Sequence, residues 1–96
     1  MTEHLELTGD LGDGLRLKKA LPIEVQAGAD WTGTFVVASE STFANYGVGD
    51  TQDEALEDLR TSLGEYYRLV EQGAGEYEDD RRELARLREY IEEIAP

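Results

Sequence analysis

The sequence predicts an α+β domain: a three- to four-stranded antiparallel sheet covered by a helix, followed by a C-terminal helix. Apolar and polar residues alternate in short runs between residues 15 and 48, as they do in strands with one buried face. From residue 51 onward, apolar residues recur at spacings of three and four, which is typical of amphipathic helices. The chain has 96 residues, so we expect residues 1–96 to form a single small domain. Its expected parts are an N-terminal arm or short strand (1–14), the sheet and first helix (15–72) and the C-terminal helix (76–95).

The N-terminal segment leaves two alternatives open. Residues 4–7 alternate as a strand would, residues 9–14 form a glycine-rich turn or link, and residues 15–17 alternate again. The two short runs either pair as a hairpin or lie frayed. The only histidine, His4, lies in this segment, and we expect it to be solvated and not catalytic.

The next part of the chain is expected to supply the body of the sheet. Because proline has no amide to donate, Pro22 should lie at an edge, a bulge or the junction of two strand pieces. Residues 28–33 are rich in turn formers and should close a hairpin around Trp31. This tryptophan either folds back on the sheet or belongs to a contact surface, and we favour folding back. Residues 34–38 should form the central strand, and residues 43–48 the strand that leads into the helix.

The turn into the first helix carries specific start signals. Gly47 and Gly49 are expected to supply backbone freedom around the turn. Thr51 and Glu54 form a capping box, in which the hydroxyl accepts from the amide of Glu54 and the carboxylate accepts from the amide of Thr51. Gly73 is suited to a left-handed cap at the helix end. One face of this helix is acidic, and the opposite face carries the apolar residues Leu56, Leu59, Leu63, Tyr66, Tyr67 and Val70.

A second helix is expected over residues 77–94. Glu78 with Arg82 and Arg88 with Glu92 are one turn apart and should pair on its wet side. Its narrow apolar stripe either packs within the domain or meets the same stripe of a second molecule. Packing within the domain is favoured, because two heptads alone rarely hold a coiled coil. The stripe consists of Leu84, Leu87, Ile91 and Ile94.

The charge of the chain is strongly acidic, with 22 acidic against 9 basic residues and a formal net charge of −13. This charge repels phosphate backbones, so we expect no direct nucleic-acid binding. Two interpretations of the acid-rich, lysine-poor surface stay open: halophilic adaptation to high internal salt, or a surface that meets a basic partner. The chain has no cysteine, no apolar run long enough for a membrane span and no signal-peptide pattern, so we expect a cytoplasmic protein without membrane association.

No constellation of residues predicts catalysis. Glu24, Glu40, Asp50 and Asp53 are the carboxylates nearest to expected strand ends, but each fits a simpler role as a solvated strand position, a loop residue or a helix-start residue. A Ser-His-Asp set cannot be formed with the only histidine at position 4, and cysteine nucleophiles are absent. We therefore expect no enzyme activity, no metal site and no cofactor.

Three segments of the sequence resemble the HicB-like domain, the antitoxin half of HicA-HicB toxin-antitoxin pairs. The resemblance covers about residues 21–71, and its specific part is the motif at the start of the helix. The segments are Ile23-Glu24-Val25, Phe35-Val36-Val37-Ala38-Ser39 and Tyr46-Gly47-Val48-Gly49-Asp50-Thr51-Gln52-Asp53-Glu54-Ala55-Leu56-Glu57-Asp58-Leu59.

The resemblance implies a truncated RNase H-like fold without nuclease residues, which neutralises a small basic RNA-cleaving HicA-like toxin by covering it. It also implies a homodimer or higher homo-oligomer. Two departures are visible. Glu40-Ser41-Thr42-Phe43 replaces the Pro-Gly pair expected before the third strand, and only one helix follows where many relatives carry a DNA-binding domain. The alternative is an orphan HicB-like structural or regulatory oligomer without a toxin partner.

The candidate partner-binding surface follows from charge and position. If binding is the function, the contact surface should combine acidic positions on the exposed side of the first helix with the tryptophan of the hairpin turn. The expected residues are Trp31, Glu54, Glu57, Asp58 and Glu65.

Overall fold

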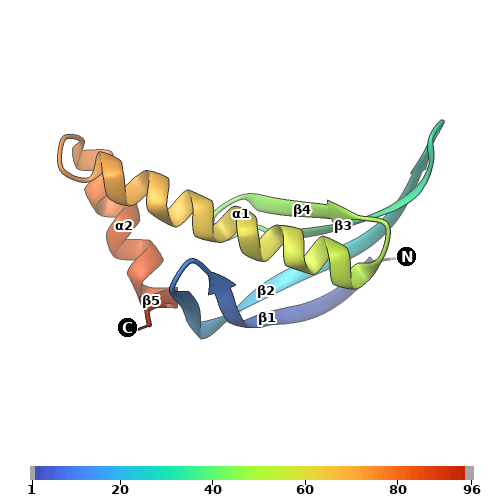
Figure 1. Cartoon of the computed structure of the whole chain (residues 1–96), viewed down its shortest axis with the longest axis horizontal. Coiled ribbons are helices and arrows are strands. Elements are labelled where there is room, and N and C mark those ends of the chain that lie inside the picture. The colour runs from blue at the N-terminus through green and yellow to red at the C-terminus, as the bar shows by residue number, and fades with distance from the viewer. Residues whose placement is uncertain (1, 95–96) are drawn as a thin grey trace.

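The computed structural model describes residues 2–94 and has an α+β architecture, in which two helices pack against one antiparallel sheet (Figure 1). The predicted fold class is therefore confirmed. The sheet has the strand order β1-β2-β3-β4, and a short fifth strand pairs with β2. The elements are β1 (Thr2–Gly12), β2 (Leu15–Asp30), β3 (Gly33–Glu40), β4 (Asn45–Gly49), α1 (Gln52–Gly73), α2 (Glu78–Tyr90) and β5 (Ile91–Glu93).

The N-terminal segment is a full strand that pairs with β2 along its length. The register runs from Thr2 opposite Gln26 to Gly12 opposite Leu15, with irregularities around Gly9 and before Gly12. Both glycines adopt positive φ, 91° and 83°, which a side chain would make costly. Of the two alternatives for this segment, the hairpin is the one that forms.

Strand β2 has different neighbours along its length. Residues 15–17 pair with β5 and residues 24–30 pair with β3, whereas β1 runs along the other side. Pro22 lies between these two paired stretches, where its missing amide can face a side without a strand. Strand β2 is continuous through Pro22, so of the three predicted settings the structure shows a local edge, because β2 has no paired strand on one side at this residue.

Helix α1 lies so close to β4 that two strand positions must be glycine. A Cβ atom on Gly47 would be 2.3 Å from the backbone nitrogen of Leu59 and 2.4 Å from the carbonyl oxygen of Ala55. A Cβ atom on Gly49 would be 2.5 Å from the Cβ of Glu54. Neither glycine has a positive φ. The expectation that they provide backbone freedom is wrong, because their role is to let the helix backbone approach the strand.

The start of α1 is capped by Thr51. Its hydroxyl oxygen accepts a hydrogen bond from the amide of Glu54 at 3.2 Å, as expected. The Glu54 carboxylate accepts from the amide of Asp50 at 3.3 Å and not from that of Thr51. The predicted hydrogen bond to the Thr51 hydroxyl is therefore confirmed. The predicted bond of the Glu54 carboxylate is wrong by one residue, because its donor is the amide of Asp50.

The end of α1 is closed without a left-handed residue. Ala74 is the C-cap residue with right-handed helical angles, and its amide donates to the carbonyls of Val70 and Glu71. The predicted left-handed cap at Gly73 is wrong. A Cβ atom on Gly73 would meet the carboxylate of Asp80 on α2, so glycine leaves room for this side chain beside the end of α1.

The C-terminal helix is shorter than predicted. Helix α2 ends at Tyr90, and Ile91 opens β5 opposite Leu17. Glu92 pairs with Arg16 of β2 at 3.2 Å, so the expected pairing of Arg88 with Glu92 is wrong. The other expected pair, Arg82 with Glu78, forms at 3.0 Å.

The apolar stripe of this region packs within the chain, as favoured from the sequence. Leu84, Leu87 and Ile91 are buried in the core, whereas Ile94 is partly exposed. They join the buried residues of α1 and the inner face of the sheet, so both helices share one core. From α1 these are Ala55, Leu59, Leu63, Tyr67 and Val70, and from the sheet they include Leu7, Leu15, Leu21, Ile23, Val25 and Ala38.

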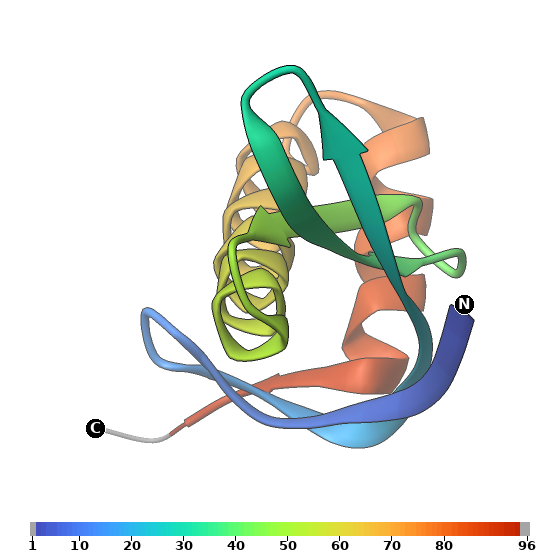
Figure 2. The same cartoon turned by 90° about the vertical axis from the view of Figure 1, so that its right-hand side faces the viewer.

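The hairpin between β2 and β3 projects beyond the helices and gives the molecule an elongated shape of 43 × 25 × 21 Å (Figures 1 and 2). Its two-residue turn is closed by Asp30, whose carboxylate accepts from the amide of Thr32 at 2.8 Å. Trp31 at this tip is 95% exposed. The expectation that Trp31 folds back on the sheet is wrong, because the hairpin extends past the body that could cover the indole.

Candidate protein-binding surface

The outer face of α1 is acidic. Glu54, Glu57, Asp58 and Glu65 are all exposed. At 100° per residue, Glu54, Asp58 and Glu65 fall on one line along the helix, and Glu57 lies to one side. The structure therefore brings the four predicted carboxylates to one side of a single helix.

Two of these carboxylates also serve the fold. Asp58 accepts a hydrogen bond from the amide of Val48 at 2.9 Å, and Glu54 accepts from the amide of Asp50. These bonds anchor the start of α1 to β4 and to the turn between them. Neither bond could be read from the sequence, because they join positions brought together only when the helix lies on the strand.

The arginines of α1 are engaged within the molecule. Arg60 donates to the carbonyl oxygen of Thr8 at 3.1 Å. Arg68 lies 3.2 Å from Asp13, 3.1 Å from Glu71 and 2.8 Å from Glu93. Within residues 2–94, neither arginine forms an ion pair with the four carboxylates of the outer face.

The contacts of Arg68 also change proton affinities. Its hydrogen bond to Glu93, together with those to Glu71 and Asp13, raises the pKa of Arg68 above the ordinary value. The same hydrogen bond lowers the pKa of the Glu93 carboxyl. The guanidinium thus stays charged and holds three elements together: α1, the turn between β1 and β2, and β5.

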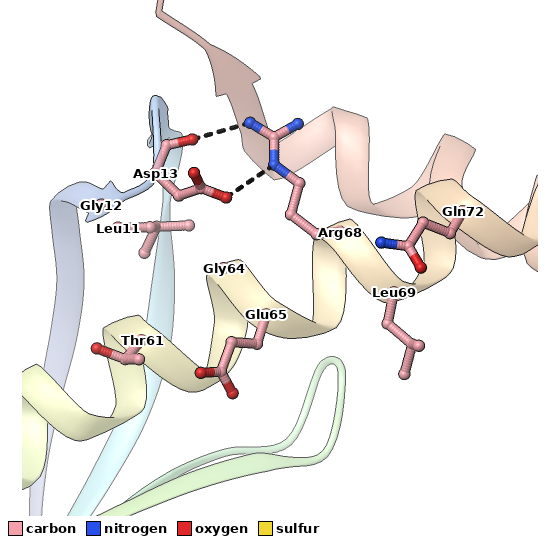
Figure 3. A pocket seen from close by; sticks show the side chains of 9 residues that line it. All are labelled: Leu11, Gly12, Asp13, Thr61, Gly64, Glu65, Arg68, Leu69 and Gln72. Atoms are coloured by element: carbon pink, nitrogen blue, oxygen red, sulfur yellow. Dashed lines mark hydrogen bonds and ion pairs between the residues drawn. The ribbon is translucent and has the colours of Figure 1, made fainter.

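A shallow groove of about 580 Å³ lies beside the acidic face (Figure 3). The turn between β1 and β2 forms one wall and the middle of α1 forms the other. The walls lie close at Gly64, where a Cβ atom would be in ordinary van der Waals contact with the carbonyl oxygen of Leu11 at 3.5 Å. Glu65 and the 67% exposed Leu69 lie along the helical wall. This groove could not be predicted from the sequence, because its walls are far apart in the chain.

Trp31 is separated from the acidic residues. The tip of the β2-β3 hairpin stands apart from α1 (Figure 1). Glu65 lies three turns into the helix from Glu54, a rise of roughly 16 Å. The five predicted contact residues thus form an acidic helix face and a distant exposed indole, and they do not make one compact site.

The buried charge of the chain has a structural role. Glu40 is 2% exposed, and its carboxylate accepts from the amides of Phe43 and Asn45, each at 2.9 Å. The Asn45 side chain in turn accepts from the hydroxyl of Ser62 on α1 at 3.1 Å. From the sequence, Glu40 was expected to be a loop residue, but the structure shows it buried at the end of β3. This carboxylate closes the turn between β3 and β4, where the sequence lacks the Pro-Gly pair.

The surroundings of His4 do not form a catalytic relay. Its Nδ1 atom is 3.8 Å from a carboxylate oxygen of Glu24, and both side chains are largely exposed. The strand register places Glu24 between His4 and Ser39, so the acid separates the base from the hydroxyl. Within residues 2–94, no group of three or more His, Cys, Asp or Glu side chains is placed to hold a metal ion.

Comparisons of the chain with protein-family models, with curated proteins and with solved structures give no match. In the part of the chain that the structure describes, no helix is both long and apolar enough to cross a membrane.

Proposed function

We propose that this chain is a non-catalytic binding module that docks a small basic protein on the outer face of α1, in the manner of a HicB-type antitoxin covering a basic RNA-cleaving toxin. The observation that carries the proposal is the exposed acidic face, whose own arginines are bound internally to Thr8, Asp13, Glu71 and Glu93. A cationic partner is the ligand that such a face attracts.

The net charge of −13 supports the same proposal through kinetics. A strongly negative molecule steers a basic partner toward itself and raises the association rate, and added salt screens this effect. Association should therefore slow as ionic strength rises. The dissociation rate should depend more on the close contacts at the interface.

The test begins with co-purification from the native cell at its own ionic strength, which identifies the basic partner. Association is then measured by stopped flow for the wild type and for the double variant Glu57→Lys/Glu65→Lys. These positions are chosen because the structure assigns Glu54 and Asp58 bonds to the fold. We expect the association rate to fall by about tenfold or more.

The matched control is Glu76→Lys/Asp79→Lys, which makes the same change in net charge at exposed positions near the start of α2. It should retain most of the wild-type rate. Equal losses in the two variants would mean that only total charge matters, and an unchanged rate in the α1 variant would remove this face as the docking site.

A second candidate function is that of a structural or regulatory oligomer without a toxin. The observation that favours it is the exposure of large apolar side chains on the sheet, among them Tyr46 and Val48. Failure of any basic protein to co-purify, together with self-association of the chain, would support this candidate over the first.

A further inference from the structure

Leu69 places an exposed apolar side chain on the acidic outer face of α1. It is 67% exposed, and in the described part of the chain it is the one large apolar side chain of this helix that is exposed. At 100° per residue, it lies about 40° around the helix from Glu65 and about 20° from Asp58. The acidic line along α1 therefore leads to Leu69.

Two hollows flank Leu69. The first is the groove of about 580 Å³ between α1 and the turn between β1 and β2 (Figure 3). The second, of about 460 Å³, lies between the end of α1 and the start of α2, and its lining includes Tyr66, Val70, Gly73, Tyr77 and Asp80. Leu69 and Gln72 line both hollows, so they form a ridge between them. We define the ridge site as Leu69 and Gln72 together with the two hollows beside them.

The first hollow contains a glycine that the fold does not require. Gly64 is buried in the middle of α1, and its φ is not positive. A Cβ atom there would be in ordinary van der Waals contact with the carbonyl oxygen of Leu11, so alanine would fit. Glycine in a helix interior is less favourable than alanine. The missing side chain at Gly64 therefore lowers stability, and what it provides is an open floor for the groove.

The borders of the ridge site are acidic. Glu65 and Asp13 line the first hollow, and Asp80 lines the second. Arg68 also lines the first hollow, but its guanidinium is bonded to three carboxylates of the chain, that of Asp13 among them. Glu65 and Asp80 form no ion pair within residues 2–94. An apolar ridge with such borders fits a segment that is apolar on one side and basic at its flanks.

We propose that the ridge site docks a basic amphipathic helix of the partner. Apolar side chains of that helix occupy the two hollows beside Leu69, and its lysines or arginines lie against Glu65 and Asp80. This inference rests on the proposed function, because it takes the partner to be the basic protein that the outer face of α1 attracts. An amphipathic helix presents apolar side chains at i, i+3, i+4 and i+7, so it can lie across a ridge with side chains on both sides. A second copy of this chain or a nucleic acid would bring negative charge against the same carboxylates.

The proposal gives the two halves of α1 different kinetic roles. The carboxylates nearer its start act at a distance, so they mainly set the association rate and its salt dependence. Side chains in the hollows act only after contact, so they mainly set the dissociation rate. A change at Leu69 that leaves the charge unaltered should therefore speed dissociation and leave association nearly as it was.

The test uses a synthetic helical peptide of about 14 residues, made only of leucine and lysine with the leucines on one face. The full chain is titrated with this peptide, and amide chemical shifts are followed by NMR. We expect the largest shifts at Leu11, Gly64, Leu69 and Tyr77. A peptide of the same composition with its leucines scattered around the helix should bind at least about tenfold more weakly, because it has the charge without the apolar face. Equal affinity for the two peptides, or shifts confined to the start of α1, would overturn the proposal.

Two variants that keep the net charge test the ridge site itself. Leu69→Ala should raise the dissociation rate of the amphipathic peptide by about tenfold. The matched control is Tyr46→Ala, at a 64% exposed position on β4, which should leave this rate unchanged. Gly64→Ala should unfold at a higher urea concentration than the wild type and yet bind the peptide more weakly, a combination that a purely structural glycine would not produce. Wild-type binding by Leu69→Ala or Gly64→Ala, or an equal loss in Tyr46→Ala, would contradict the docking site.

The outcomes distinguish this proposal from the proposed function. If no basic protein co-purifies with the chain, the proposed function fails, and the peptide titration still decides whether the ridge site takes a basic amphipathic helix. If a basic protein co-purifies and leaves Leu69→Ala as slowly as it leaves the wild type, the ridge site is wrong and the acidic face stands without it.

Discussion

At the scale of single residues, Tyr66 illustrates how packing between the helices changes a proton affinity. Its hydroxyl on α1 donates to the carboxylate of Glu83 on α2. Burial, followed by this hydrogen bond and the negative charge of Glu83, raises the pKa of Tyr66 from 10.0 to about 12. All three effects favour the neutral phenol, because burial disfavours the charged form, the hydrogen bond needs the phenol proton, and ionisation would place a second negative charge beside the carboxylate.

We predict that Tyr66 is the tyrosine whose ionisation depends on Glu83. The Glu83→Gln variant should move the pKa of Tyr66 from about 12 back toward 10.0. Tyrosinate absorbance measures the titration, and subtracting the curve of Tyr66→Phe isolates this residue among the five tyrosines. An unchanged difference curve in Glu83→Gln would contradict the proposed cause.

The raised pKa of Tyr66 also predicts how the stability of the fold changes with pH. The pKa is raised in the folded state, so the contribution of neutral Tyr66 is fully present below the unfolded value of 10.0. It is lost as the pH rises from there through the folded value of about 12. Wild type and Tyr66→Phe should therefore differ in their pH dependence of unfolding only in this alkaline window.

At the scale of elements, the seat of α1 on β4 depends on the absence of a side chain at Gly47. We predict that Gly47→Ala lowers the free energy of unfolding by about 3 kcal/mol or more, because the new methyl group would meet the backbone of Leu59 and Ala55. Urea denaturation measures the change. Gly75→Ala is the control, since a Cβ atom there has nothing within 4 Å and φ is not positive. It should be neutral or slightly stabilising, and equal losses in both variants would contradict the close-approach explanation.

The elements also mark how far the sequence could predict the fold. Hydrophobic periodicity predicted α1, its buried face and the cap at Thr51, because these depend on neighbouring residues. It predicted a helix through Ile91, whose spacing from Leu87 fits a helix equally well. Strand β5 forms because residues 15–17 of β2 offer an edge at that place, and a distant edge leaves no local signal.

The features of the candidate site also differ in whether the sequence could predict them. Helical spacing correctly placed the acidic residues of α1 on the exposed side, since exposure follows from the position of the apolar face. The bond of Asp58 to Val48 and the burial of Glu40 depend on tertiary approach. The exposure of Trp31 depends on how far the hairpin extends, which β-turn residues alone do not determine.

At the scale of the whole molecule, Arg68 joins parts that are far apart in the chain. We predict that Arg68→Gln releases β5 from the body, because the variant cannot hold Asp13 and Glu93 together. Amide hydrogen exchange should accelerate at Ile91 and Glu93, with only a modest loss of global stability, since the ion pairs are partly exposed. Arg82→Gln removes a surface pair with Glu78 and should leave that exchange unchanged. Unaltered protection of β5 in Arg68→Gln would show that strand pairing alone holds the C-terminal segment.

The sheet edges formed by β1 and β4 bear on how the protein behaves when it is concentrated. An open strand edge is a template for unwanted fibres, and a chain with so much sheet is exposed to that hazard. Here the Val48 amide of β4 is already occupied by Asp58, and β1 carries Glu3, Glu6 and Asp10 along its length. Stacking of many copies edge to edge would bring like charges together on one side and displace an existing bond on the other. The carboxylate that secures α1 to its strand thereby also guards the protein against aggregation.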